Sequence, residues 1–163
     1  MGSVVILGVF VADTAYRAAR MPVMGETIMG TSFSLGPGGK GSNQAVACAR
    51  IGAQTHMIAL LGQDGFGKLA LDPGAEPGVI PHVRQLSESY TGAAHIFIED
   101  GTGDNAIIIA PGAAALMTVA DIEAQAELIA GADVFVTQLE QPMDVAMRGL
   151  QMAREAGVTT ILN

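Results

Sequence analysis

Short apolar runs alternate with amphipathic stretches along the whole chain. Continuous apolar or β-branched runs are typical of strands buried on both faces, and here they cover Val4 to Val9, His56 to Leu61, Val134 to Val136 and Val158 to Leu162. A helix rich in small residues is predicted from Gly41 to Gly52, and another after Pro142, ending at Gly157. The second helix is predicted to bury a stripe of Met143, Met147 and Leu150. This alternation predicts parallel βαβ units and an α/β fold.

Other segments predict a smaller sheet and a loop. Met24 to Leu35 alternates loosely between polar and apolar positions and predicts short strands of a separate sheet. Ala93 to Glu99 and Ala106 to Ile109 predict a hairpin. Prolines and glycines make Asp72 to Pro81 a predicted loop. Thr118 and Asp121 have the spacing of a capping box before a further helix.

Composition narrows the class of protein. The 163 residues suit one domain; 50% are hydrophobic, 15% are charged and the formal net charge is −8. Without a basic run, the sequence predicts no nucleic-acid partner and no binding to an anionic membrane. The longest apolar tract, Ala106 to Ala120, is broken by Pro111 and Gly112, so no membrane span is expected. With no signal peptide recognised and Cys48 as the single cysteine, we expect a cytoplasmic protein.

Polar residues follow several predicted strands. Ligands of open α/β sheets bind beyond the carboxyl ends of the strands. Four such ends are predicted, at Ala12-Asp13, Gly62-Gln63-Asp64, Gln138-Leu139-Glu140 and Asn163.

A glycine cluster before the first predicted helix is the clearest candidate site. Gly36-x-Gly38-x-x-Gly41 formally matches a dinucleotide fingerprint, but Pro37 lacks an N–H group and Met24 to Leu35 separates the cluster from the first strand. A Walker A loop is excluded because Gly41 follows Lys40. The helix N-terminus, with Lys40 and Asn43, suits a polyhydroxylated or anionic small molecule. A tight turn that needs glycine is the structural alternative.

The same segment resembles a known family. Gly38-Gly39-Lys40-Gly41-Ser42-Asn43-Gln44-Ala45-Val46-Ala47, continuing to Ala53, is similar to the N-terminal signature of the ribokinase-like carbohydrate kinases, the phosphofructokinase B family. Further matching segments are Gly8 to Asp13, Pro22 to Gly30, Gly62 to Gly67, Thr91-Gly92, Asn105 to Gly112 and Gln138 to Pro142. The resemblance implies that residues 1–163 form the N-terminal half of a ribokinase-like α/β sandwich. Its central sheet is parallel, and residues 24–35 and 93–109 form a small β-sheet lid.

The resemblance also implies a sugar site. Asp13 and Glu140 would accept hydrogen bonds from sugar hydroxyls, as charged acceptors do well. Gly39, Lys40 and Asn43 would hold the other side of the sugar. The apolar cover from the lid would come from Ala94, Ile96 and Ile109. ATP and Mg²⁺ would be the cofactors, and two chains would pair through their lids. His56, His82 and His95 have no ligand spacing, so no metal site is predicted.

The sequence departs from the family in three places. Val11 stands where the family leads one to expect an Asn that contacts the sugar, which leaves ribose specificity open. The helix expected over Lys68 to Gly78 must be short or absent, because Pro73 and Pro77 interrupt it. Family members are nearly twice as long, and their Gly-Ala-Gly-Asp motif with the catalytic base does not occur here. The chain is therefore predicted to supply the sugar-binding half of a sugar kinase. The alternatives are a non-catalytic sugar-binding or assembly fragment and a dinucleotide-binding oxidoreductase domain.

Overall fold

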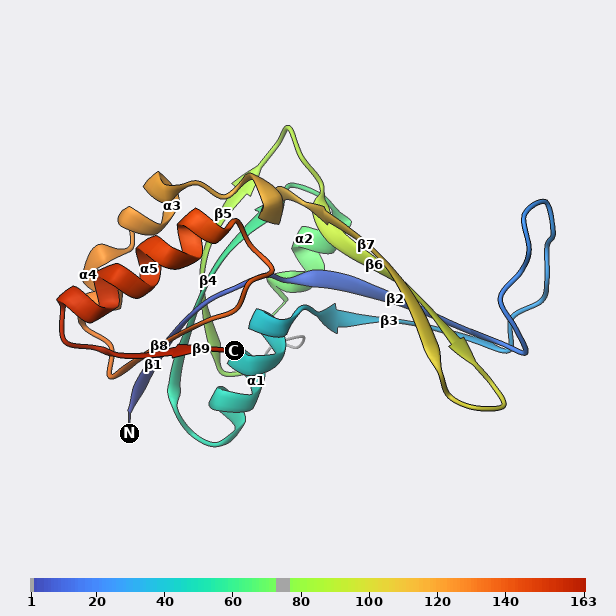
Figure 1. Ribbon diagram of the computed structural model, residues 1–163, viewed down its shortest axis with the longest axis horizontal. Helices are drawn as coiled ribbons and strands as arrows, with labels where there is room; N and C mark the ends of the chain where they lie inside the picture. Colours follow the sequence, from blue (N-terminus) through green and yellow to red (C-terminus); the bar gives the residue numbers. More distant parts are fainter. Residues whose placement is uncertain (1, 73–76) are drawn as a thin grey trace.

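Two sheets organise the chain in a computed structural model that describes residues 2–72 and 77–163 (Figure 1). The main sheet has five parallel strands in the order β5-β4-β1-β8-β9. Their bounds are β1 Ser3–Leu7, β4 Gln54–Gly62, β5 Val79–Leu86, β8 Val134–Thr137 and β9 Thr159–Leu162. The α/β prediction and the predicted parallel main sheet are confirmed.

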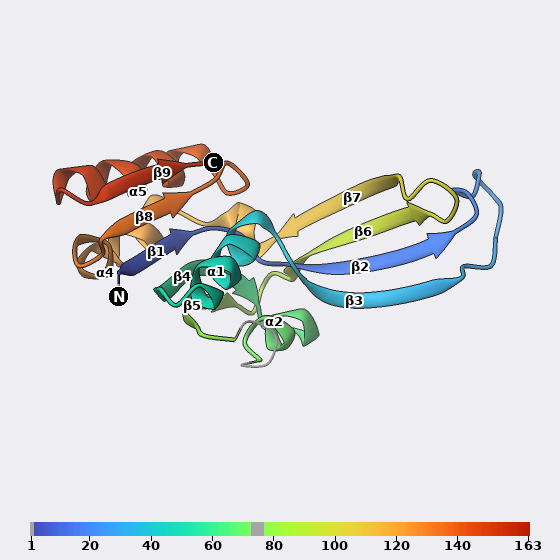
Figure 2. The ribbon, with the colours of Figure 1, turned by 90° about the horizontal axis from the view of Figure 1, so that it is seen from below.

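Alternate side chains of the central strands build two apolar layers. Val5 and Leu7 of β1 lie in one layer and Ile6 in the other, and all three are fully buried. The first layer is covered by α3 (Val119–Glu123), α4 (Ala126–Ala130), α5 (Met143–Glu155) and the short 3-10 helix η1 (Ala113–Leu116). The second layer is covered by α1 (Lys40–Arg50) and α2 (Gly65–Ala70). Figure 2 shows these helices on opposite sides of the main sheet, which explains why its central strands are apolar on both faces.

A second sheet extends away from the main one as an arm (Figures 1 and 2). This lid sheet has the order β3-β2-β6-β7, from β2 Val11–Ala18, β3 Ser32–Gly38, β6 Thr91–Glu99 and β7 Asn105–Gly112. The predicted hairpin is confirmed as the antiparallel pair β6–β7. The sequence analysis missed β2. It also predicted strands over residues 24–31, which form none. Asp13 consequently lies inside β2 and not beyond the end of a strand.

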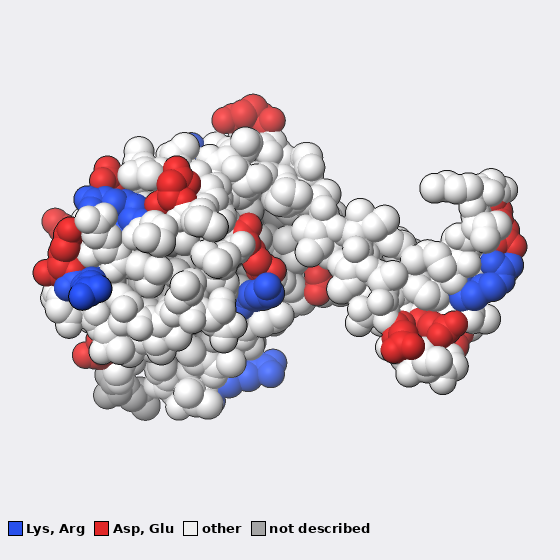
Figure 3. All heavy atoms as spheres, viewed as in Figure 1, with Lys and Arg blue, Asp and Glu red and all other residues white. Residues whose placement is uncertain are grey.

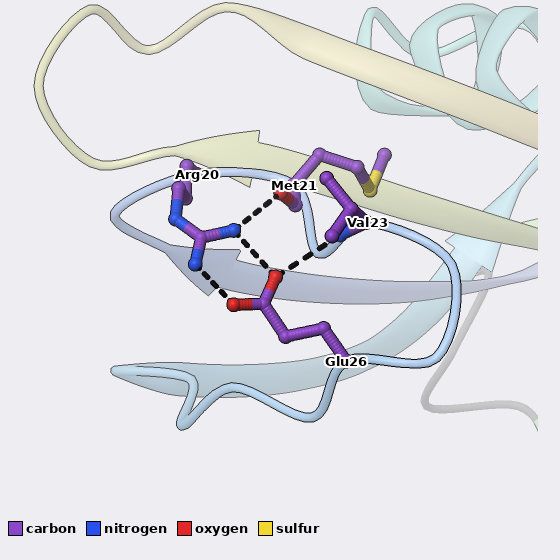
Figure 4. Close-up of polar contacts among 4 residues, drawn as sticks. All are labelled: Arg20, Met21, Val23 and Glu26. Carbon is purple, nitrogen blue, oxygen red and sulfur yellow. Dashed lines mark hydrogen bonds and ion pairs between the residues drawn. The ribbon is translucent and has the colours of Figure 1, made fainter.

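A polar network holds the start of the segment 24–31 in a loop. The guanidinium of Arg20 donates to both carboxylate oxygens of Glu26 and to the carbonyl of Met21, as Figure 4 shows. The N–H of Val23 donates to Glu26 Oε2 over 3.1 Å. These bonds close a compact loop at the far end of the arm. The apolar residues that suggested a strand, including Met24 and Met29, are exposed there.

Three further predictions, a short helix, a loop and a capping box, concern residues 65 to 130. α2 ends at Ala70, so the expected short helix is confirmed; residues 73–76 of the predicted loop lie outside the described residues. The rest of that loop prediction was wrong from Val79 onward, where β5 begins. Pro81 is tolerated because β5 is an edge strand. The capping box of Thr118 and Asp121 is confirmed, although the helix divides into α3 and α4.

The predicted buried stripe of α5 was wrong for its two methionines, whereas Leu150 is partly buried against the core. Met143 and Met147 are 65% and 59% exposed, whereas the buried positions are Val145, Ala146, Gly149 and Ala153. Gly149 faces the ring of Phe135, whose Cζ lies 2.8 Å from where a Cβ would stand. The helix therefore has two apolar stripes, and the one made of small residues packs closest to the sheet.

The surface agrees with the charge pattern of the sequence. On the face drawn in Figure 3, Lys and Arg lie singly among Asp and Glu and form no basic patch. None of the helices in residues 2–72 and 77–163 has the length and apolar character needed to cross a bilayer.

Candidate functional site

The N-terminus of α1 packs onto the turn that follows β1. At Gly39, φ is +94°, and an added Cβ would lie 2.3 Å from the carbonyl oxygen of Val9. At Gly41, an added Cβ would lie 2.6 Å from the Cα of Gly8. These two glycines are thus required for close backbone packing, which agrees with the alternative interpretation of the cluster as a tight turn that needs glycine. The same packing places the first turn of α1 at the junction of the two sheets.

Glu140 joins this helix N-terminus from the turn after β8. Its Oε2 accepts a hydrogen bond of 2.9 Å from the backbone N–H of Lys40. Its Oε1 lies 3.8 Å from the ammonium nitrogen of the same lysine. A carboxylate is favoured here by the free N–H groups and the positive end of the helix dipole. Glu140 and Lys40, which are 100 residues apart in sequence, therefore form an ion pair at the start of α1.

Asp13 reaches the same junction from β2. Its carboxylate occupies the space beside Gly38, where an added Cβ would lie 2.2 Å from Oδ2. Burial raises the pKa of Asp13, and the negative charge of Glu140 raises it further. The two carboxylates are thus close enough to repel each other. A ligand with several hydroxyl groups would supply hydrogen-bond donors to both.

The predicted cover residues share one face of the lid sheet with Asp13. Asp13 pairs with Ala94 of β6, and Ala94 pairs with Ile109 of β7. Residues opposite each other on adjacent strands project to the same side, as do residues two positions apart, so Ile96 belongs to this face too. Ala94 is buried and Ile109 is 56% exposed. The lid sheet consequently presents an apolar surface next to the carboxylate.

Asn43 and Val11 complete the predicted set. The N–H of Asn43 bonds to the carbonyl of Gly39 within the first turn of α1, and its side chain is exposed. Val11 lies two positions before Asp13 on the same face of β2 and is only 5% exposed. It packs in an apolar cluster with Ala94 and Ala114. The structure therefore places every predicted sugar-binding residue on α1, the lid sheet or the turn after β8.

Sequence reasoning missed the amides that fix the turn carrying Glu140. Gln138 is fully buried, and its Nε2 donates to Oε1 of Gln44 in α1. Gln141 donates to the hydroxyl of Thr137 and to the carbonyl of Gln138, each over 2.6 Å. The sequence did mark this region, because both glutamines lie beside Glu140 in the segment from Gln138 to Pro142 that resembles the family. A glutamine in a turn nevertheless gives no indication from sequence that it is buried.

Asp64, the acidic residue of the formal dinucleotide pattern, has a structural role. Its carboxylate accepts hydrogen bonds of 2.7 Å from the N–H groups of Gly67 and Thr91. Burial acts to raise the pKa of Asp64, but hydrogen bonds from Gly67, Thr91 and Phe66 outweigh it and lower the pKa. Asp64 thereby caps α2 and ties it to the start of β6. Its carboxylate is not free to bind a ribose in the manner of a dinucleotide site.

Comparisons with known proteins agree with this architecture. Residues 1–163 match the pfkB family carbohydrate kinase. Ribokinase of Mus musculus is 34% identical over 162 residues, covering 99% of this chain and 50% of that protein. Ribokinase of Schizosaccharomyces pombe is 35% identical, covering 100% and 53%. Arabidopsis thaliana ribokinase, solved with ribose and ATP, superimposes with a TM-score of 0.84 at 31% identity, covering 99% and 53%. The chain thus spans about half the length of the curated relatives it matches.

Proposed function

Because the chain belongs to the pfkB family of carbohydrate kinases, we propose that it supplies the sugar-binding part of an ATP-dependent kinase. Its substrate would be ribose or a related pentose, phosphorylated on a hydroxyl group. The observation that carries the proposal is the meeting of Asp13 and Glu140 at the N-terminus of α1, beside the apolar face of the lid sheet.

Each residue has a distinct role in this proposal. Asp13 and Glu140 accept hydrogen bonds from sugar hydroxyls, and Lys40 and Asn43 donate to the hydroxyl oxygens. Gly39 would contact the sugar through its backbone, and its lack of a side chain lets the start of α1 pack against Val9. Ala94, Ile96 and Ile109 cover the sugar and exclude water. Hydrogen bonds shielded from water in this way orient the substrate more firmly.

The residues at the junction do not form a site for the phosphates of ATP. The space around Gly39 and Gly41 is filled by the backbone of Gly8 and Val9, so these glycines leave no cradle for a phosphate. Within residues 2–72 and 77–163, no group of three or more His, Cys, Asp or Glu could hold a metal ion. ATP is the phosphoryl donor that the family implies, with Mg²⁺ as its expected companion.

We further propose that two copies pair through their lid sheets. The face of the lid sheet away from Asp13 exposes Tyr16, Phe33, Leu35 and Ile108. Tyr16 contacts Phe33 and His95, with ring centroids 5.0 and 5.1 Å apart. Exposed aromatic and aliphatic side chains gathered on one face are typical of protein interfaces. A cytoplasmic location is part of the proposal and suits a chain whose single cysteine is Cys48.

A non-catalytic sugar-binding module is the second candidate. The two candidates share the sugar site and differ in turnover. With ATP, Mg²⁺ and the bound sugar, release of ADP above the rate without sugar would establish the kinase.

The sugar site itself is tested by thermal unfolding of the 163-residue chain. A panel of sugars led by D-ribose is added, and a sugar present at a hundred times its Kd would stabilise the fold by about 2.7 kcal/mol. Asp13→Ala should abolish the shift while leaving the far-UV circular dichroism spectrum unchanged. Asp104→Asn, in the exposed hairpin turn, is the matched control and should keep the shift. If no sugar raises the unfolding temperature of the wild-type chain, the proposed function is wrong.

A further inference from the structure

Two histidines meet on the main sheet, away from the junction that holds Asp13 and Glu140. His56 in β4 and His82 in the edge strand β5 have Nδ1 and Nε2 2.9 Å apart, and their ring centroids are 5.1 Å apart. His56 precedes the last residue of β4, Gly62, by six positions, which is about 20 Å along a strand. The pair therefore lies toward the opposite end of the sheet from the carboxyl ends of the strands.

The register places both rings on one face of the sheet. His82 pairs with Ile58, and His56 pairs with Ile80. Ile58 belongs to the apolar layer under α3 and α5, so both rings lie on that side, where they are half-buried. Because β5 is the outermost strand, the pair sits at the rim of the layer. Solvent can reach the two rings there.

The separation of the two nitrogens suits a metal ion with ligands at right angles. Imidazole nitrogens bind transition metals at about 2.05 Å, so two adjacent ligands at 90° stand about 2.9 Å apart and two tetrahedral ligands about 3.3 Å apart. The observed separation of 2.9 Å is that of a hydrogen bond between the two rings, and it lies close to the first arrangement, so the nitrogens need little movement to bind one ion. Nitrogen ligands in a square-planar or tetragonal arrangement are typical of Cu²⁺ and Ni²⁺.

The charges around the pair permit a cation. Arg84 lies two positions after His82 on the same face, but its guanidinium is bound to Asp121 of α3, with Nε 2.7 Å from Oδ1. Burial lowers the pKa of His82, and so does the neighbouring His56.

We propose that His56 and His82 form a binding site for one divalent transition-metal ion, Cu²⁺ or Ni²⁺, with water in the remaining positions. In the metal-free protein the two rings share one hydrogen bond. When the ion binds, the ring that donated this hydrogen bond carries its proton on its other nitrogen, so that both facing nitrogens bind the ion through lone pairs. The ion thereby joins the edge strand β5 to β4. No third protein ligand is found in the part of the chain that the structure describes. The site is therefore expected to bind reversibly and to stabilise the sheet edge, not to support the fold outright.

Electron paramagnetic resonance of the 163-residue chain with one equivalent of Cu²⁺ at pH 7.5 tests this directly. The expected spectrum shows two imidazole nitrogens bound to one ion. A spectrum with one imidazole nitrogen or none would overturn the proposal. In a parallel titration with Ni²⁺ alone, the unfolding temperature should rise with a one-to-one endpoint.

Single variants locate the site. His56→Asn and His82→Asn should each weaken Ni²⁺ binding at least tenfold. His95→Asn, on the lid sheet, is the matched control and should leave the binding unchanged. The unfolding temperature of each variant without metal shows whether it folds; if one does not, the copper spectrum of the wild-type chain still decides. Equal losses in all three variants would overturn the proposal.

Discussion

Asp13 combines a proposed binding role with an unfavourable position for its charge. Its carboxylate is partly buried beside Gly38 and faces the charge of Glu140, and both effects raise its pKa above the usual value. In the folded protein Asp13 thus binds a proton more readily than in the unfolded chain. Its protonation stabilises the fold below pH 3.8, and that contribution is lost as pH rises through the raised pKa. Residues kept for function often reduce stability in this manner.

Asp13→Asn should therefore increase the free energy of unfolding at pH 7 while abolishing sugar binding. The amide removes the buried charge and its repulsion with Glu140. The gain should shrink as pH falls through the raised pKa, because wild-type Asp13 then becomes neutral as well. Urea unfolding from pH 3 to pH 7 measures both trends, with Asp104→Asn as the control. If the variant were less stable than wild type at pH 7, the charge of Asp13 would be stabilised by its surroundings, and this prediction would be wrong.

Val11 offers a second prediction on the same strand. Its side chain is buried with Ala94 and Ala114, so an amide placed there would lack hydrogen-bond partners in the free protein. Val11→Asn should lower stability without sugar by roughly 1–3 kcal/mol. If a ribose hydroxyl faces this position, the variant should show a larger ribose-induced rise in unfolding temperature than wild type. Val11→Ala adds no polar group, so its ribose-induced rise in unfolding temperature should not exceed that of wild type. Equal shifts in all three proteins would place the sugar away from Val11.

Sequence reasoning named the charged residues of the candidate site but not the side chains that support them. Asp13, Lys40 and Glu140 come together because their segments end at one junction, and the resemblance supplied that geometry. The buried contact between Gln138 and Gln44 depends on residues 94 positions apart in sequence. No local pattern marks such a pair, because a glutamine is exposed in most contexts.

At the scale of elements, four of the five strands of the main sheet were predicted and β5 was missed, whereas the lid sheet was predicted only in part. Strands buried on both faces, such as β4, form continuous apolar runs that sequence shows clearly. β2 was missed because its residues are mixed in polarity, with Asp13 on one face and Tyr16 on the other. Its strand conformation comes from pairing with β3 and β6 and not from its own pattern. On α5, two competing apolar stripes could be ranked only once the packing of Gly149 against Phe135 was known.

The start of α1 gives a prediction at this scale. Gly39 adopts φ +94° against the carbonyl of Val9, whereas Gly36 has ordinary φ and nothing within 4 Å of an added Cβ. Gly39→Ala should therefore destabilise the fold by about 1–3 kcal/mol through backbone strain, with a further cost from the contact. Gly36→Ala, in the same cluster, should change stability little. Chemical denaturation of both variants measures the difference. If the two variants are equally stable, the packing of α1 on the β1–β2 turn is not what requires Gly39.

At the scale of the whole molecule, two apolar surfaces lie far apart. The first is the outer face of the lid sheet, with Tyr16, Phe33, Leu35 and Ile108. The second lies between α5 and β9, where a groove of about 590 Å³ is lined by Met147, Leu150, Gln151, Arg154, Thr160 and Leu162. All four residues of β9 are exposed, and β9 is an edge strand of the main sheet. An edge strand beside exposed apolar side chains is a template for association.

We therefore expect the 163-residue chain to self-associate through both surfaces, and single charges should separate the two contributions. Phe33→Glu should remove the proposed lid dimer and leave association through α5 and β9. Met147→Glu should remove the larger species and leave a dimer. Ile51→Glu, at an exposed position after α1, should behave as wild type. Sedimentation velocity over a range of concentrations distinguishes these cases. A wild-type chain that stays monomeric at every concentration would show that neither surface associates on its own. The proposal of a lid dimer would then be wrong for this chain.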